Sequence, residues 1–227
     1  QAFPRLPLLE LLEGRGEEVL DEAQVWLEAG RSLTSVEGDP RAFKITDSWD
    51  WEVAQHMAEE GTSLRCGHGF DVHPLVPGRS LVLGGVLLEE APLGLEGHSD
   101  ADVICHAVSD ALLGAAGEPD IGLLFPASEE RYRGADSLDL LRQVVRRVRD
   151  RGGAIRWVDV TLQAQIPRLK PHLDRIRRSL EGVLRQPGEE DRRILNLKVK
   201  SGEFVGSVGR GECMVCHAVA TLVLPGP

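Results

Sequence analysis

The stretch RCGHGFDVHPLVPGRSLVLGGVLLEEAPLGLEGHSDADVICHAVSDALLGAAG covers residues 65–117 and holds four of the seven histidines of the chain. Most of its polar residues flank apolar runs instead of forming a long polar loop. Asp71 and His73 are two positions apart, so a strand ending there would present both side chains on one face. We therefore expect a site where this strand meets the next helix.

That helix is predicted over residues 99–116. Ser99 is a suitable N-cap, and Asp102 stands at the capping-box position. Asp102, His106 and Asp110 are spaced four residues apart, which places them on one line of the helix surface. Either carboxylate could therefore orient the imidazole of His106 by a hydrogen bond.

The strand end and the helix together offer three metal ligands, Asp71, His73 and His106. Catalytic zinc typically has three protein ligands and one open position, whereas structural zinc has four ligands and favours cysteine. The pattern thus favours a catalytic metal. The alternative is that both histidines are ordinary, partly buried side chains, because the motif D-x-H alone does not separate the two interpretations.

Six sequence blocks resemble, in order, the 2-C-methyl-D-erythritol 2,4-cyclodiphosphate synthases: GHGFDVH, GHSDADVICHAVSDALLGAAG, EPDIGLLFP, GADS, VDVTLQAQIPRLKPH and GRGE. For residues 65–227, the resemblance implies an α/β (α+β) fold whose mixed, mostly four-stranded sheet carries helices on one face. It also implies a homotrimer with active sites between subunits. Each site would hold one Zn²⁺ and one Mg²⁺ or Mn²⁺, and the substrate would carry a phosphate and a cytidine diphosphate.

The same resemblance implies roles for individual residues. Zinc would be held by Asp71, His73 and His106, and the second metal by Glu203. Catalytic roles fall to His98 and Ser201, the latter standing where the family has threonine. The substrate would be bound by Ser99, Asp110, Asp120, Gly122, Phe125, Ala164, Pro167, Arg168, Leu169, Lys170 and Arg210.

Three positions depart from the family pattern. Arg168 replaces a lysine and keeps the charge without the geometry. An aromatic residue is missing at Ser207, which we expect to alter the cavity around the threefold axis. An acidic position is lost near Ala127, which we expect to loosen contact with the sugar-alcohol part of the substrate.

The implied reaction closes a ring. A phosphate oxygen of the substrate attacks the β-phosphorus of its cytidine diphosphate, and cytidine monophosphate (CMP) leaves. Two other functions stay open: a zinc hydrolase, which would activate water at the metal, and a non-catalytic trimer that binds an isoprenoid diphosphate or a partner.

Residues 1–64 differ from the rest and show no catalytic motif. Helices are predicted over residues 6–12, 21–29 and 47–60, and a strand over residues 41–46. The segments QAFPR, LDEAQVWLEAG and VEGDPRAFKIT resemble the C-terminal end of 2-C-methyl-D-erythritol 4-phosphate cytidylyltransferases. We expect residues 1–64 to be a remnant of that domain without an active site. The chain would then be a fragment of a bifunctional enzyme, and the boundary between its two domains would lie near residues 60–63.

Hydrophobic patterning predicts further elements in the second part of the chain. Proline and glycine predict a loop over residues 118–126, and five arginines give the helix at residues 136–151 a solvated face. Another helix is predicted to begin at Pro171. Strands are predicted over residues 80–88, 155–166 and 194–200.

Composition limits the classes of partner. Hydrophobic residues make up 42% of the sequence, and the net charge is −10, which argues against nucleic acid or an anionic membrane as the main partner. The sequence has no apolar run of eighteen residues and no recognisable export signal. Its four cysteines are too few to cross-link a chain of this size, so we expect a cytoplasmic protein.

The run CMVCH at residues 213–217 has the spacing of a haem-attachment motif. The apolar residues that follow predict a buried strand, in which neighbouring side chains alternate between faces. We therefore favour a strand over a haem site. A zinc knuckle is equally disfavoured, because the second cysteine pair that it requires is absent.

Overall fold

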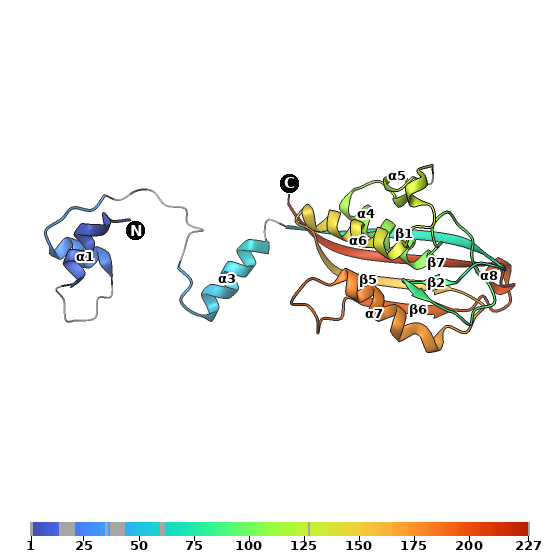
Figure 1. Ribbon diagram of the computed structural model, residues 1–227. Helices are drawn as coiled ribbons and strands as arrows, with labels where there is room; N and C mark the ends of the chain where they lie inside the picture. The colour runs from blue at the N-terminus through green and yellow to red at the C-terminus, as the bar shows by residue number, and fades with distance from the viewer. Residues whose placement is uncertain are drawn as a thin grey trace. The chain divides into compact units, whose positions relative to one another are not determined.

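The structure is a computed structural model that describes residues 2–13, 21–34, 36, 44–59, 62–126 and 128–226. Two compact units divide the chain between Met57 and Ala58, and Figure 1 shows the elements of each. None of the helices in these described ranges combines the length and the apolar character needed to span a bilayer.

The first unit is helical. Asp21 caps the second helix by accepting a hydrogen bond from the amide of Ala23, and the Trp26 indole donates to the carbonyl oxygen of Ser32 at 3.1 Å. Residues 41–43 of the predicted strand lie outside the described residues, and residues 44–46 form no strand. The three predicted helices are present as α1 (Arg5–Glu13), α2 (Glu22–Glu28) and α3 (Ser48–Glu59).

The second unit is built on a five-stranded sheet with the order β4-β1-β7-β5-β6. Strands β5 and β6 are parallel, and the other pairs are antiparallel. The prediction of a mixed, mostly four-stranded sheet is confirmed, because β4 adds only two residues at the edge. The strands are β1 (Thr62–Val76), β4 (Gly94–Leu95), β5 (Ala154–Gln163), β6 (Leu195–Lys200) and β7 (Cys213–Pro225).

The three long helices lie against one face of this sheet (Figure 1). The first of them is almost wholly buried, whereas the other two bury one apolar stripe each. They are α4 (Val103–Ala116), α6 (Ser137–Asp150) and α7 (Leu173–Leu184), and the short helices are α5 (Ile121–Leu124), η1 (Glu130–Tyr132), η2 (Lys170–His172) and α8 (Gly206–Gly209).

Two glycines of β1 allow α4 to pack directly on the strand backbone. A methyl group added at Gly69 would overlap the carbonyl oxygen of Ala107 and would lie 2.7 Å from the amide nitrogen of Ala111. A methyl group added at Gly67 would likewise lie only 3.0 Å from the Cα atom of Ala115, in the next turns of the helix. This close approach brings His106 on α4 to the end of β1 that carries Asp71 and His73.

The start of α4 differs from the prediction. The helix begins at Val103, and its N-cap is Asp102, whose Oδ1 accepts the amides of Ile104 and Cys105, each at 3.1 Å. Ala101 has a φ of +57°, a left-handed conformation that interrupts a helix. The prediction that Ser99 caps this helix is therefore wrong.

The predicted strand over residues 80–88 is a small hairpin of β2 (Val82–Leu83) and β3 (Val86–Leu87). Gly84 and Gly85 have φ values of +58° and +73°, which suit a tight two-residue turn. The Gly85 amide donates to Oδ2 of Asp102 at 2.7 Å, so the turn is tied to the start of α4.

The other predictions in this unit hold, with shifts of a few residues. The predicted loop over residues 118–126 contains α5, because Asp120 caps a single helical turn there. Asp136 is the N-cap of α6. The CMVCH run lies at the start of β7, where Cys213 and Cys216 are both buried.

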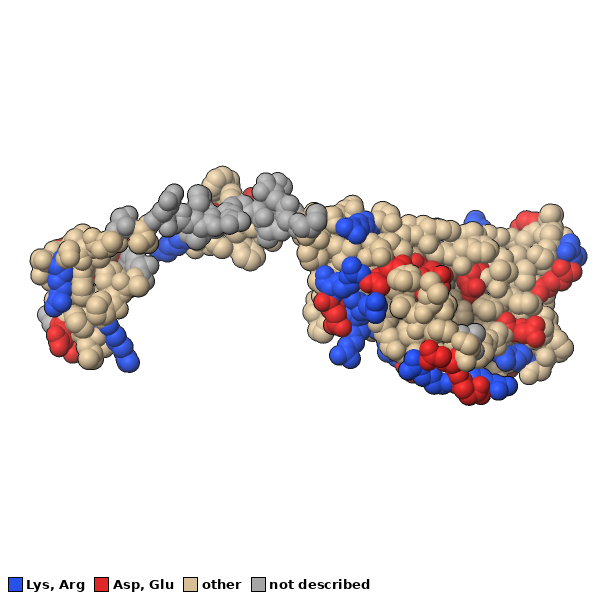
Figure 2. Space-filling view, turned by 90° about the horizontal axis from the view of Figure 1, so that it is seen from above, with Lys and Arg blue, Asp and Glu red and all other residues tan. Residues whose placement is uncertain are grey.

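Charged side chains of both signs share the surface, and Figure 2 shows them intermixed on the face in view. Arg147 on α6 and Arg151 directly after it both pair with Glu118. Arg149 instead turns inward and donates to the carbonyl oxygens of Leu184 and Arg185 at 3.1 and 2.6 Å. The predicted solvated face of α6 therefore has one exception.

Substitution of Gly69 by alanine tests the helix-on-strand contact. We expect Gly69→Ala to lower the free energy of unfolding by about 1–3 kcal/mol or more, because α4 must move to admit the methyl group. The matched control is Gly182→Ala on α7, where an added Cβ meets nothing within 4 Å and alanine favours the helix by about 0.5–1 kcal/mol. Urea unfolding followed by circular dichroism measures both, and a Gly69→Ala protein as stable as wild type would contradict the packing argument.

Candidate functional site

Three potential metal ligands meet where α4 crosses the end of β1. Oδ2 of Asp71 lies 2.9 Å from Nε2 of His73 and 2.9 Å from Nδ1 of His106. The two imidazole nitrogens are 3.2 Å apart. Asp71, His73 and His106 form the one group among the described residues whose ligand atoms are arranged to hold a metal ion.

The spacing of these three atoms suits a tetrahedral ion. Ligand atoms bound at about 2.0–2.1 Å in a tetrahedron are about 3.3 Å from one another, close to the separations seen here. The side chains of Asp71, His73 and His106 are 23%, 16% and 15% exposed, so the centre is sheltered but reachable. No fourth His, Cys, Asp or Glu of the described ranges joins the group, which leaves a position for an outside ligand.

Hydrogen bonding and charge also favour a cation between these groups. Nδ1 of His73 lies 2.7 Å from the carbonyl oxygen of Glu96. Because a carbonyl oxygen only accepts, Nδ1 must donate, and the lone pair of Nε2 in the neutral ring faces Asp71. The donor set therefore fits a divalent ion.

In the metal-free chain, hydrogen bonds and charge within the group shift the pKa of Asp71 and of His73. Burial raises the pKa of Asp71, but hydrogen bonds from His106 and His73 outweigh burial and hold that pKa well below its usual range. Burial lowers the pKa of His73, but the hydrogen bond and charge of Asp71 outweigh it, and the net shift is upward. The carboxylate thus stays ionised, as metal binding requires.

The second nitrogen of His106 contacts two serines. Its Nε2 lies 2.9 Å from Oγ of Ser137 and 3.2 Å from Oγ of Ser99. The carboxylate of Asp102 accepts hydrogen bonds from the amides of Gly85 and of the first turn of α4. The carboxylate of Asp110 accepts a hydrogen bond from the amide of Ile121 at 2.8 Å. The prediction that one of these aspartates orients His106 is therefore wrong.

A cavity of about 170 Å³ opens beside the two histidine ligands. Asp120 caps α5 through the Leu123 amide at 2.9 Å, and with Asp110 it positions the α5 segment on the cavity wall. Tyr132 and Leu140 also line the cavity, and sequence reasoning missed both because no motif marks them. The predicted residues that line it are His73, His98, Ser99, His106, Gly122 and Phe125.

The other predicted residues lie at the ends of β5 and β6 and in the segments that follow. The Ala164 amide donates to the carbonyl oxygen of Lys200 at 2.9 Å, and Oγ of Ser201 donates to Glu203 at 2.5 Å. Arg210 pairs with Glu212 at 2.8 Å. The remaining members are Pro167, Arg168, the buried Leu169 and Lys170.

Within one chain, the predicted residues at the metal cavity and those at the ends of β5 and β6 form two separate sets. Across the described ranges, no hydrogen bond or ion pair links the metal ligands to Ser201, Glu203 or Arg210. Ala127 lies outside the described residues. The hydroxyl of Ser207 accepts a hydrogen bond from the Cys213 thiol at 3.3 Å. This side chain therefore makes a contact within its own subunit.

Arg79 holds the loop that carries His98 and Ser99. Its guanidinium donates to the carbonyl oxygens of Leu95, Gly97 and Ser99 at 3.2, 3.1 and 3.0 Å. The sequence offered no signal for this role, because Arg79 stands in a polar turn remote from the loop in sequence.

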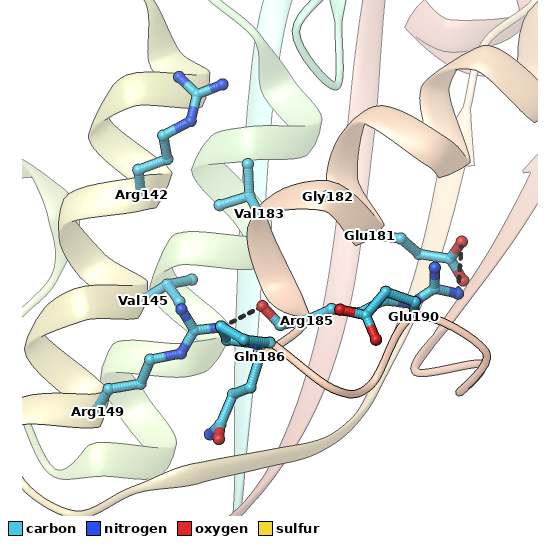
Figure 3. Close-up of a pocket in the computed structure, with 10 residues that line it drawn as sticks. Arg142, Val145, Arg149, Glu181, Gly182, Val183, Arg185, Gln186 and Glu190 are labelled. Carbon is cyan, nitrogen blue, oxygen red and sulfur yellow. Dashed lines mark hydrogen bonds and ion pairs between the residues drawn. The ribbon is translucent and has the colours of Figure 1, made fainter.

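A larger hollow lies between α6 and the end of α7, and Figure 3 shows the arginines and carboxylates that line it. The buried Glu181 pairs with Arg177 at 2.7 Å and with Arg185 at 3.2 Å. Arg149 holds the end of α7 through the backbone contacts given above. These charges serve contacts within the fold, and we assign no chemistry to this hollow.

Comparison with known proteins identifies the family. The model described as the YgbB family matches residues 64–223. The chain belongs to the YgbB family. The 2-C-methyl-D-erythritol 2,4-cyclodiphosphate synthase of Synechococcus sp. is 49% identical over 167 residues, which cover 73% of this chain and 98% of that protein.

Relatives also match the first part of the chain. The bifunctional enzyme IspD/IspF of Anaeromyxobacter sp. is 41% identical over 227 residues, which cover 98% of this chain and 56% of that protein. The chain therefore spans little more than half the length of this bifunctional relative.

Solved structures agree with the family assignment. A 2C-methyl-D-erythritol-2,4-cyclodiphosphate synthase aligns with a TM-score of 0.62 at 38% identity and covers 70% of this chain and 99% of its own. The bifunctional IspDF from Campylobacter jejuni aligns with a TM-score of 0.66 at 31% identity, covering 96% of this chain and 57% of its own. The predicted fold class of the YgbB domain is thus confirmed.

Proposed function

We propose that this chain converts 4-diphosphocytidyl-2-C-methyl-D-erythritol 2-phosphate into 2-C-methyl-D-erythritol 2,4-cyclodiphosphate and CMP, a step of non-mevalonate isoprenoid biosynthesis. The observation that carries the proposal is the triad of Asp71, His73 and His106, whose two histidines line a cavity and which lacks a fourth ligand among the described residues. The 49% identity to a protein named for this synthase activity supports it.

The obstacle to the reaction is the repulsion between two anionic groups. A divalent ion in the triad, zinc in this proposal, would act as a Lewis acid and neutralise charge on the diphosphate. His98 is exposed at the mouth of the cavity and binds the attacking phosphate. Holding the reacting groups about 3–3.5 Å apart supplies an intramolecular advantage of roughly 7–11 kcal/mol.

The nucleotide end of the substrate contacts both sets of residues. The cytosine is held by Ala164, Pro167, Arg168, Leu169 and Lys170. Asp120 and Gly122, beside the cavity, bind the ribose.

The diphosphate needs separate groups. Arg210 binds it after releasing Glu212, and the hydroxyl of Ser201 contacts the charge that develops during the reaction. Glu203 fits a second ion, Mg²⁺ or Mn²⁺, as a single protein ligand, since such ions are commonly held by one or two carboxylates together with substrate phosphates.

The proposal includes a homotrimer whose active sites lie between subunits. Phe70 and Val72 are 50% and 45% exposed on the sheet face opposite the helices, and Val219 is 43% exposed on the neighbouring strand. An apolar face of this kind favours association. Assembly would also allow Ser201, Glu203 and Arg210 of one subunit to complete the metal cavity of another.

The first part of the chain has a separate origin in this proposal. Residues 1–64 are the C-terminal remnant of a cytidylyltransferase domain, and residues 65–227 are the synthase domain of a bifunctional parent enzyme. The relatives named IspD/IspF, which match across this boundary, support that division. The four free cysteines are consistent with a cytoplasmic location.

Release of CMP tests the proposed reaction. The protein is incubated with the cytidine diphosphate substrate and divalent metal, and CMP is quantified by chromatography. We expect His106→Ala to lower the rate by more than about 100-fold, since it removes stabilisation of the transition-state charge. Ser109→Ala is the matched control on α4, because the Ser109 hydroxyl is buried without a hydrogen-bond partner among the described residues, and we expect the wild-type rate.

The outcomes separate the three candidate functions. Absence of CMP from intact, zinc-loaded wild-type protein would contradict the synthase. A hydrolase would also release CMP, but with water as the nucleophile, so a linear bisphosphate in place of the cyclic diphosphate would indicate a hydrolase. A His106→Ala variant that loses stability, while wild type shows no turnover, would indicate a binding protein.

A charge placed on the open sheet face tests the proposed assembly. We expect Phe70→Asp to convert a trimer into monomers, because an ionised carboxylate resists burial in an apolar interface. Sedimentation velocity measures the mass of each form. Leu27→Asp is the control, at a 55% exposed leucine of α2, and should leave the trimer intact. A monomeric wild type, or a trimeric Phe70→Asp, would contradict this interface.

A further inference from the structure

Ser137, the first residue of α6, occupies a central position behind the metal ligands. Its side chain is fully buried, and its Oγ contacts three groups. Nε2 of His106 is 2.9 Å away, Oδ1 of Asp100 is 2.5 Å away, and Oγ of Ser99 is 3.2 Å away. Ser137 and Asp100 belong to sequence blocks of the family resemblance, GADS and GHSDADVICHAVSDALLGAAG, but neither was assigned a role in the site.

The direction of these hydrogen bonds follows from the chemistry of the groups. An ionised carboxylate only accepts, so the Ser137 hydroxyl donates its proton to Asp100. The lone pairs of the hydroxyl oxygen then face His106, whose Nε2 must donate. When a metal ion takes the place of the proton at Nδ1, which lies 2.9 Å from Asp71, the ring keeps its proton at Nε2 and the lone pair of Nδ1 is free to bind the ion.

We infer that Asp100 and Ser137 are positioning residues that fix the tautomer and the orientation of His106 and so set the metal affinity of the centre. The inference rests on the metal site of the proposed function, and it does not depend on which reaction the site catalyses. A hydrogen-bond acceptor behind a histidine ligand, most often a carboxylate, a backbone carbonyl group or a water, typically serves this purpose.

Backbone contacts hold the two positioning residues in place. Oδ2 of Asp100 accepts the Ser137 amide at 3.1 Å, in addition to the hydroxyl bond at Oδ1. The Asp100 amide donates to the carbonyl oxygen of Ala135 at 3.2 Å, and the Gly134 amide donates to that of His98 at 2.9 Å. The loop before α4 and the loop before α6 are thereby joined directly behind the metal ligands.

The two histidine ligands are therefore held by different means. His73 is fixed by a backbone carbonyl, that of Glu96, which no side-chain substitution removes. His106 depends on a hydroxyl that a single substitution deletes. Ser99, at 3.2 Å from Nε2, is a longer and weaker acceptor, so loss of the Ser137 hydroxyl should weaken the site without abolishing it.

Zinc affinity of the full chain tests the inference. Metal-free wild type, Ser137→Ala, Ser137→Thr and Ser109→Ala are titrated with zinc against a chromophoric chelator. We expect Ser137→Ala to weaken binding by about 10–100-fold, and Ser137→Thr to restore it because threonine keeps the hydroxyl. Ser109→Ala, which deletes an equally buried serine hydroxyl that has no partner among the described residues, should bind zinc as wild type does.

A second measurement uses wild-type protein and does not depend on the folding of a variant. In zinc-loaded protein, long-range ¹H–¹⁵N NMR should show His106 bound to the metal through Nδ1 and protonated at Nε2. Unchanged zinc affinity in Ser137→Ala, failure of threonine to restore affinity, or zinc bound at Nε2 of His106 in wild type would each overturn the inference. Wild type that binds zinc but releases no CMP would contradict the proposed reaction and leave this inference standing.

Discussion

The contact between the α4 backbone and the glycines of β1 determines the rest of the site. Gly67 and Gly69 leave no room for a side chain beneath Ala107, Ala111 and Ala115, so helix and strand meet at backbone distance. Because Asp71 and His73 lie in the last part of β1, the same contact places His106 directly above them. Three ligands from two distant segments then need only small adjustments to hold one ion.

Around this contact, each neighbouring element supports the metal ligands through hydrogen bonds. The β2–β3 turn is tied to the N-cap Asp102, the loop between β4 and α4 supplies the carbonyl oxygen of Glu96, and the start of α6 supplies Ser137. One chain therefore completes the metal centre, whereas the residues proposed for the base and the diphosphate of the nucleotide lie in another part of the fold. The uncovered sheet face offers a physical reason for the two parts to meet through assembly.

Local patterns in the sequence predicted the ligands and most of the elements correctly. Asp71 and His73 share a strand face by spacing alone, and His106 follows from the apolar helix around it. The partner of His106 could not be found in this way. Ser137 is 31 residues further along the chain, in a different helix, and only the folded loops bring it near. The sequence instead favoured Asp102 and Asp110, which share a helix face with His106. The carboxylate of Asp102, however, accepts hydrogen bonds from the first turn of α4 and from the Gly84–Gly85 turn. That turn lies within an apolar run that we predicted to be a single strand.

The central claim is that these two imidazoles and one carboxylate form a metal centre with an open position. X-ray absorption spectroscopy at the zinc edge, on purified protein of known zinc content, tests it most directly. The account predicts one zinc per chain, bound by two imidazole nitrogens and a carboxylate oxygen at about 2.0–2.2 Å, together with one ligand that is not from the protein. Protein without bound zinc, or zinc with sulfur or a fourth protein side chain in its coordination shell, would contradict the account.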